Sequence, residues 1–163
     1  MGRNTKTKNL VLNGMIAALY LALTILVNPV AQGPIQFRVS ESLNHLVVFN
    51  KKLIWGVLGG VVIYNFLFSE FGLLDILFGG GQTFLALSLS IVVGKYVSSV
   101  KLRLALNTLF FTASMALIAW MLHLAVAAPF WLTYGTAALS EFVIMAISAP
   151  VMYIISKKID LSS

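Results

Sequence analysis

The sequence predicts an all-α membrane protein that forms one integral domain over residues 1–163, with six transmembrane helices and both termini in the cytoplasm. Two features of composition support this class. Sixty per cent of the residues are hydrophobic and only 10% are charged, whereas soluble domains carry about 25% charged residues. The mean hydropathy is +0.96. Lipid must therefore cover most of the surface.

The third observation is a series of apolar segments separated by short polar stretches. A helix that crosses the hydrocarbon core needs about 20 apolar residues. Four segments reach this length, and the fifth, at 53–68, is slightly short. The remaining segment, at 43–50, is too short to cross unless residues 38–42 extend it, which brings Arg38, Glu41 and His45 to membrane depth. The expected helices are 9–30, 38–50, 53–68, 73–95, 103–127 and 135–157.

The positions of the cations predict the orientation. With six crossings, ten of the eleven lysines and arginines fall on one side of the membrane, and only Arg38 lies towards the other. Cytoplasmic loops are enriched in Lys and Arg. If 38–50 were re-entrant, five crossings would remain and several later clusters would lie outside. We therefore expect six crossings, and we interpret the net charge of +6 as membrane anchors and not as a nucleic-acid site.

Several polar side chains fall within the expected membrane region, where they are costly and by default indicate a functional site. Glu41, Asp75 and Glu141 lie near the outer ends of three helices. Arg38 and Glu41 are three residues apart, so they can pair on a helix, either within a site or as a structural ion pair. The other candidates for substrate binding are Gln36, Asn65, Gln82 and Trp131.

Two patterns leave alternatives open. Trp131 belongs to an aromatic group in an expected outer loop at 127–135, where it either anchors the protein at the interface or lines a site. Gly14, Ala18 and Ala22 form a strip of small residues on the first helix, which either docks on a partner or packs within the chain.

Motifs for other chemistries are absent from the sequence. It contains no GxxxxGK[ST] phosphate loop, no HExxH and no GxSxG. Cysteine is absent, and His45 and His123 are remote from any metal-ligand spacing, so we expect them to be hydrogen-bonded interior or interfacial residues. We expect no metal, no cofactor, no catalytic residues and no ATPase site in this chain.

Specific segments resemble one family. Residues 33–43 (GPIQFRVSESL), Asn65 and residues 73–79 (LLDILFG) are similar to the QueT-type queuosine-precursor transporters. The lysine pair at 51–52 and Glu141 also fit, and the resemblance extends from about residue 9 to 157.

Such proteins are the substrate-binding S components of energy-coupling factor (ECF) transporters in the prokaryotic plasma membrane. The resemblance implies that the chain captures its substrate near the outer surface. It then associates with a transmembrane coupling subunit and two cytoplasmic ATPase subunits, which drive import. It further implies that Ala18 and Ala22, extended by Gly14, dock on the coupling subunit.

Queuosine precursors are 7-deazaguanine bases. A carboxylate can accept both donors of a guanine-like edge, and Glu141 and Asp75 are the leading candidates. Gln36, Arg38 or Asn65 could donate to the ring carbonyl, whereas Glu41, held by Arg38, is a candidate structural residue. The alternatives are an S component for another vitamin-like molecule, or a stand-alone membrane enzyme or structural protein.

Overall fold

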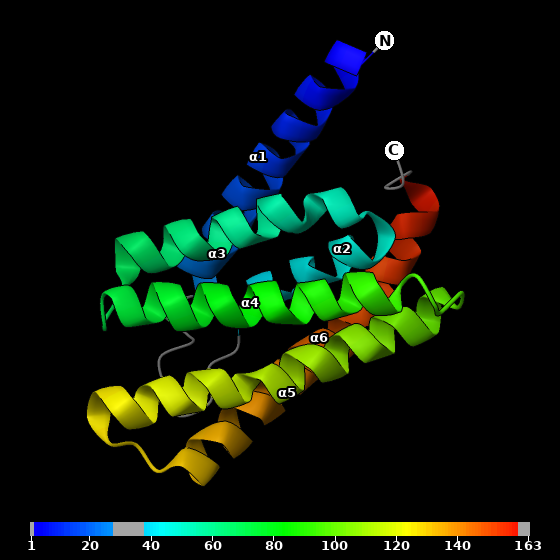
Figure 1. Cartoon of the computed structure of the whole chain (residues 1–163). Coiled ribbons are helices and arrows are strands. Elements are labelled where there is room, and N and C mark those ends of the chain that lie inside the picture. Colours follow the sequence, from blue (N-terminus) through cyan, green and yellow to red (C-terminus); the bar gives the residue numbers. More distant parts are fainter. Residues whose placement is uncertain (1, 28–37, 160–163) are drawn as a thin grey trace.

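The computed structural model describes residues 2–27 and 38–159, which are helical apart from short connections (Figure 1). No strand occurs among these residues. Five helices are long and apolar enough to cross a membrane, so the prediction of a multi-pass helical membrane protein is confirmed. The elements are α1 (Gly2–Val27), η1 (Val39–His45), α2 (Leu46–Phe49), η2 (Lys51–Leu53), α3 (Ile54–Phe68), α4 (Leu73–Val93), α5 (Val100–Val126) and α6 (Phe130–Lys158).

The expected second helix differs from the prediction. Instead of an α-helix over 38–50, the chain forms the 3₁₀ helix η1 followed by the single turn of α2. A 3₁₀ helix rises about 2.0 Å per residue, against about 1.5 Å in an α-helix. The segment therefore covers more depth than its few residues would in α-helical form, which explains how so short a stretch connects the two faces of the bundle.

The directions of α1 and α3 show that this short segment returns across the bundle. The Asn13 side chain of α1 accepts a hydrogen bond of 2.6 Å from the backbone N–H of Gly56, near the start of α3. Further along both helices, Tyr20 packs so closely on Gly60 that an added Cβ would lie 2.7 Å from the tyrosine. Since α1 and α3 run in the same direction, residues 38–53 must run back between them.

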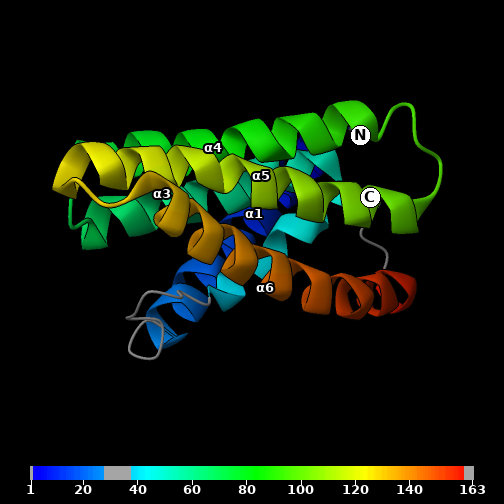
Figure 2. The same ribbon diagram turned by 90° about the horizontal axis from the view of Figure 1, so that it is seen from below.

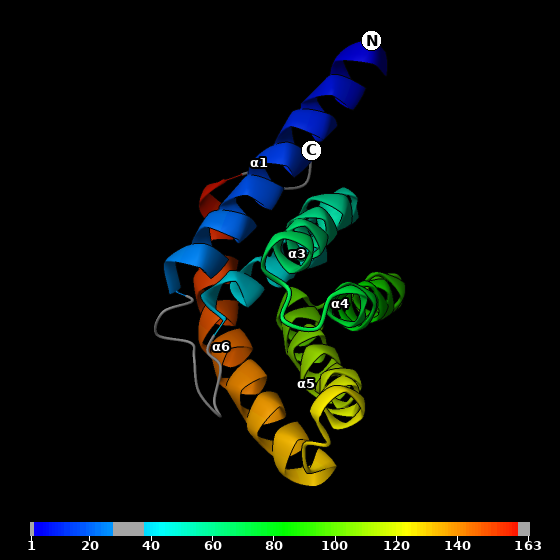
Figure 3. The ribbon, with the colours of Figure 1, turned by 90° about the vertical axis from the view of Figure 1, so that its left-hand side faces the viewer.

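The remaining helices alternate in direction, so the end of α6 lies on the same face as the beginning of α1 (Figures 1 and 3). This face also holds η2 with Lys51 and Lys52, and the α4–α5 connection. We call it the cationic face. The structure thereby gathers the lysine clusters as the sequence predicts.

The long helices surround the short second segment. Each of α1, α3, α4, α5 and α6 contacts the next, and η1 closes the ring because it contacts both α1 and α6. Figure 2 shows α5 between α4 and α6. α2 contacts α4 and α5. Residues 40–48 therefore lie inside the bundle, and several polar side chains there are fully buried.

A chain of hydrogen bonds connects buried polar groups of α4, α5 and α6 to His45, next to α2. Ser90 donates to the Asn107 carbonyl (2.5 Å), and Asn107 donates to Nδ1 of His45 (3.1 Å). Nε2 of His45 donates to the backbone carbonyl of Met145 (2.9 Å). His45 is therefore a hydrogen-bonded interior residue, as expected, and the described residues contain no cluster of three or more potential metal ligands.

The last helix starts earlier than predicted. The expected outer loop over 127–135 is wrong, because α6 begins at Phe130 and the connection comprises only residues 127–129. Ala127 ends α5 in the left-handed conformation (φ 53°), and Pro129 precedes the first turn of α6. A proline at a helix start removes no intrahelical hydrogen bond. The aromatic residues after it are thus helical.

Candidate functional site

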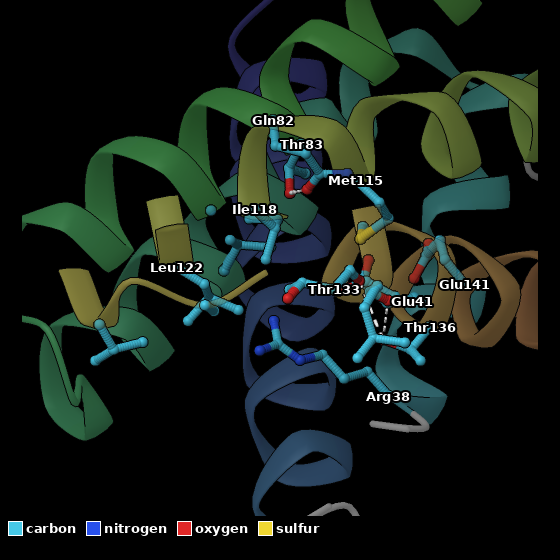
Figure 4. A pocket seen from close by; sticks show the side chains of 16 residues that line it. Arg38, Glu41, Gln82, Thr83, Met115, Ile118, Leu122, Thr133, Thr136 and Glu141 are labelled. Carbon is cyan, nitrogen blue, oxygen red and sulfur yellow. Dashed lines mark hydrogen bonds between the residues drawn. The ribbon is translucent and has the colours of Figure 1, made fainter. Parts of the chain in front are cut away.

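A cavity of about 400 Å³ lies in the half of the bundle away from the cationic face, where its lining includes Ala128 of the α5–α6 connection. Figure 4 shows the side chains that line it. Its walls come from η1, α3, α4, the second half of α5 and the first half of α6, and this volume is typical of small-molecule sites. The lining residues are Arg38, Glu41, Val61, Gly79, Gln82, Thr83, Met115, Ile118, Leu122, Val126, Ala128, Leu132, Thr133, Thr136, Ala137 and Glu141.

One carboxylate of the cavity already has donors from the protein. Glu41 is buried in η1, and its Oε1 accepts a hydrogen bond of 2.7 Å from the hydroxyl of Tyr20 in α1. Its Oε2 accepts one of 2.5 Å from the Asn44 amide, one 3₁₀ turn further along. Each oxygen of Glu41 therefore has a donor, and the side chain is fixed in position.

The second carboxylate is different. Glu141, on α6, is only 6% exposed, and its Oε1 has no hydrogen-bond partner within residues 2–27 and 38–159. A buried polar atom without a partner costs about 1–3 kcal/mol, and more when it is charged. Because Glu141 lines the cavity, this oxygen is available to a ligand that brings donors.

Further polar groups line the same cavity. The Arg38 side chain extends into the cavity, towards Thr133 (Figure 4). On α4, the Gln82 amide donates a hydrogen bond of 2.7 Å to the hydroxyl of Ser114. Its carbonyl oxygen accepts one of 3.3 Å from the hydroxyl of Thr83. The Gln82 amide is thus held against α5, with its neighbour Thr83 also in the lining.

The apolar walls are aliphatic. They include Met115, Ile118 and Leu122 of α5 and Leu132 of α6, and the lining contributed by the described residues contains no aromatic ring. Trp131 is 79% exposed and packs edge-on against Phe130, with ring centroids 5.1 Å apart. Its position fits the interfacial anchor among the two alternatives, since such rings sit at the membrane–water boundary.

The structure places Asp75 outside the cavity lining. This residue is in the first turn of α4, and its Oδ2 accepts hydrogen bonds from the Ser69 hydroxyl (2.8 Å) and from the backbone N–H groups of Glu70 and Phe71 (2.9 Å each). Asn65 also lies outside the lining, and its side chain donates a hydrogen bond of 3.0 Å to the backbone carbonyl of Asp75. Both residues organise the α3–α4 connection.

Of the eight residues predicted to bind substrate, four line the cavity together: Arg38, Glu41, Gln82 and Glu141. Gln36 lies outside the described residues. Sequence reasoning missed the threonines of α6. Thr133, Ala137 and Glu141 follow one another at intervals of four residues, so they share one helix face. Starting the helix at 135 concealed this pattern, because Thr133 was assigned to a loop.

Comparison with known proteins identifies the family. The model of the QueT transporter family matches residues 10–157, most of the chain. The queuosine precursor transporter QueT of Lactococcus lactis subsp. cremoris is 39% identical in an alignment covering 98% of this chain and 99% of its own length. No solved structure gives a significant match. The chain, a multi-pass helical membrane protein, therefore belongs to the QueT transporter family.

Proposed function

We propose that this chain is the substrate-binding S component of an ECF-type importer and that its cargo is a queuosine precursor, a 7-deazaguanine base. Membership of the QueT transporter family and the name of the Lactococcus relative support the cargo. The site of capture is the cavity described above, which faces away from the cationic face. The positive-inside rule makes the cationic face cytoplasmic, so that the cavity faces outward in the cell membrane.

The observation that carries the assignment of the site is the free Oε1 of buried Glu141. A guanine-like edge presents two adjacent donors, the ring N–H and the exocyclic amine, and an ionised carboxylate is an acceptor with two oxygens. Binding of the base supplies the donors that Glu141 lacks. Glu41 contributes negative charge nearby, but Tyr20 and Asn44 already hold both of its oxygens.

The same edge of the base also carries a carbonyl, directly next to the ring N–H, and this carbonyl requires a donor. Arg38 extends into the cavity and supplies guanidinium donors for it (Figure 4). The flat faces of the base then rest on Met115 and the aliphatic side chains around it. Methionine suits this role because its flexible, polarizable thioether makes favourable contacts with aromatic rings.

The strip on α1 supports the proposed partner. Gly14, Ala18 and Ala22 are all exposed, and an added Cβ at Gly14 would meet nothing within 4 Å. The helix packs on α3 through another face, which includes Asn13 and Tyr20. The strip is therefore open to a second protein, and small residues permit the close approach of a membrane helix. We propose that the transmembrane coupling subunit docks there.

Ligand binding to the purified protein tests the proposed cargo. Titration with 7-aminomethyl-7-deazaguanine is expected to raise the melting temperature, because a ligand that binds only the folded state stabilises it. Guanine serves as the matched control for the deazapurine ring. Mass spectrometry of the ligand extracted from the purified protein provides a second measurement. Recovery of an unrelated vitamin-like molecule, with no response to any deazaguanine, would exclude the cargo proposed here.

The docking strip is tested separately, by the pair Ala18→Trp and Ala22→Trp. Tryptophan there blocks close helix approach, so uptake and co-purification of the coupling subunit are expected to collapse, with affinity for the base unchanged. The control is Leu85→Trp with Leu89→Trp, which places the same two rings on exposed positions of α4. Normal uptake by the α1 variant would eliminate this docking surface. Uptake by the isolated chain without ATPase subunits would eliminate the S-component role.

A further inference from the structure

A second cavity lies on the outside of the bundle, between the beginning of α5 and the end of α6. The two helices meet at residues 127–129 and separate towards the cationic face (Figure 2). Between them the structure has a groove of about 450 Å³. We call it the α5–α6 groove, and its lining residues are Lys101, Leu104, Ala105, Thr108, Leu109, Phe142, Ala146, Ala149, Pro150 and Tyr153.

The side chains that form the walls of the groove are mostly apolar, and several of them are small. Ala105 on α5 faces Ala146 and Ala149 on α6, and these short side chains leave its depth open. The hydroxyl of Thr108 donates to the backbone carbonyl of Leu104 (3.1 Å), so it presents no unsatisfied polar group to the groove. The interior therefore suits a hydrocarbon chain and offers nothing to a polar solute.

The length of the groove corresponds to half a bilayer. On α5 it extends from Lys101 to Leu109, and on α6 from Tyr153 to Phe142. At 1.5 Å per residue these stretches are about 12 and 16 Å long. Half of a hydrocarbon core of about 30 Å is about 15 Å. The groove thus runs from the cationic face to approximately the middle of the membrane.

Two cations converge at the mouth of the groove. The ammonium groups of Lys101 and Lys157 lie 5.8 and 4.6 Å from the centroid of the Tyr153 ring. No carboxylate in the described part of the chain pairs with either lysine; Glu41 and Glu141 lie at the substrate cavity, and Glu70 and Asp75 at the α3–α4 connection. An anion at this mouth would offset the repulsion between two neighbouring positive charges.

We propose that the α5–α6 groove is a binding site for an anionic glycerophospholipid of the leaflet next to the cationic face. One acyl chain lies along the alanines, and the phosphate contacts Lys101 and Lys157. A basic pocket between membrane helices at the cytoplasmic side is a typical lipid headgroup site. This site is distinct from the substrate cavity and is independent of the cargo.

Native mass spectrometry tests the proposal with the whole chain. The protein is released from mixed micelles that contain phosphatidylglycerol and phosphatidylcholine with identical acyl chains. The wild type is expected to retain phosphatidylglycerol preferentially. Each lysine near an anionic surface contributes about a fivefold preference. Lys101→Gln with Lys157→Gln is therefore expected to reduce the preference by roughly 25-fold if the two act independently.

Three comparisons separate the groove from general surface charge. The control Lys51→Gln with Lys52→Gln removes two exposed cations from the same face and is expected to leave the preference unchanged. Ala105→Leu with Ala146→Leu fills the groove and is expected to abolish retention of the lipid while the lysines remain. Glycerol phosphate, which has the headgroup chemistry without chains, is expected not to displace it.

Any of four results would overturn the proposal. These are a wild type without headgroup preference, an equal effect of the Lys51 and Lys52 control, full displacement by glycerol phosphate, and normal lipid retention in the filled groove. If filling the groove instead abolishes co-purification of the coupling subunit and leaves the lipid in place, the groove is a protein interface.

Discussion

Asp75 and Glu141 are both acidic residues in the part of the bundle away from the cationic face, yet their surroundings differ. Asp75 is in the first turn of α4 and accepts three hydrogen bonds from the preceding connection. Glu141 is about three turns into α6, and its Oε1 has no partner among the described residues. The first turn of a helix has unpaired N–H groups and a positive dipole end, which a carboxylate stabilises. In the interior of a helix, where Glu141 lies, all backbone N–H groups already donate to backbone carbonyls of the same helix.

On the basis of this difference we propose different tasks for the two carboxylates. An acid at a helix start is satisfied by its own chain, whereas an acid in the helix interior must find a side chain, water or ligand. The sequence contains both as isolated acids in apolar segments, so hydropathy cannot separate them. The distance of each acid from the start of its helix separates the two cases, provided that the start of the helix is known.

The largest expected effect is on ligand affinity in Glu141→Gln. The amide replaces an acceptor oxygen with a donor that opposes the donors of the base. Loss of a hydrogen bond to a charged group is about 1.5–3 kcal/mol, which corresponds to roughly a ten- to 150-fold weaker Kd. The measurement is calorimetric titration with 7-aminomethyl-7-deazaguanine.

The melting temperature of ligand-free Glu141→Gln separates binding from folding. It is expected to equal or exceed that of the wild type, because the substitution removes an unpartnered buried carboxylate. Glu70→Gln, at an exposed position, is the matched control. Unchanged affinity would remove Glu141 from the site, and a lower melting temperature without ligand would mark it as structural.

Asp75→Asn is expected to have the opposite profile. The neutral amide is a weaker acceptor for Ser69 and the two backbone N–H groups. Weakening of these hydrogen bonds is expected to lower the free energy of unfolding by about 0.5–1.5 kcal/mol. Affinity for the base is expected to stay at the wild-type value, because Asp75 is outside the cavity lining. Melting with and without ligand measures both quantities. A loss of affinity at unchanged stability would return Asp75 to the list of ligand contacts.

Most of the fold follows from hydropathy and charge, because long apolar helices and lysine clusters carry strong signals. The second segment does not, since a short 3₁₀ helix that buries Ser40, Asn44 and His45 has no apolar period. Arg38, Glu41, Gln82 and Glu141, which line the cavity, were selected from the sequence because polar groups are costly in a membrane. The same criterion also selected Asn65 and Asp75, whose hydrogen bonds are within the chain. The free-energy cost of a polar group in the membrane marks a residue as noteworthy, but it does not show whether the partner of that residue is a ligand or another part of the chain.

Tyr20 shows what sequence reasoning cannot reach, and it supplies the smallest of the expected effects. It lies on α1, 21 residues before Glu41, and its role depends on how α1 packs against η1. Tyr20→Phe keeps the ring against Gly60 and removes only the donor to Oε1 of Glu41. Asn44 still holds Oε2, so Glu41 stays near its position but can rotate.

Affinity for the base in Tyr20→Phe is therefore expected to fall about fivefold, equivalent to about 1 kcal/mol for one hydrogen bond. Tyr64→Phe is the control, because it makes the same chemical change at a ring that stacks on Phe68 and lies outside the cavity lining. In a Glu141→Gln background the Tyr20 effect is expected to persist if Glu41 acts on the base independently. If the two substitutions together weaken binding no more than Glu141→Gln alone, Glu41 acts on the base only through Glu141, and the two carboxylates form a single recognition unit.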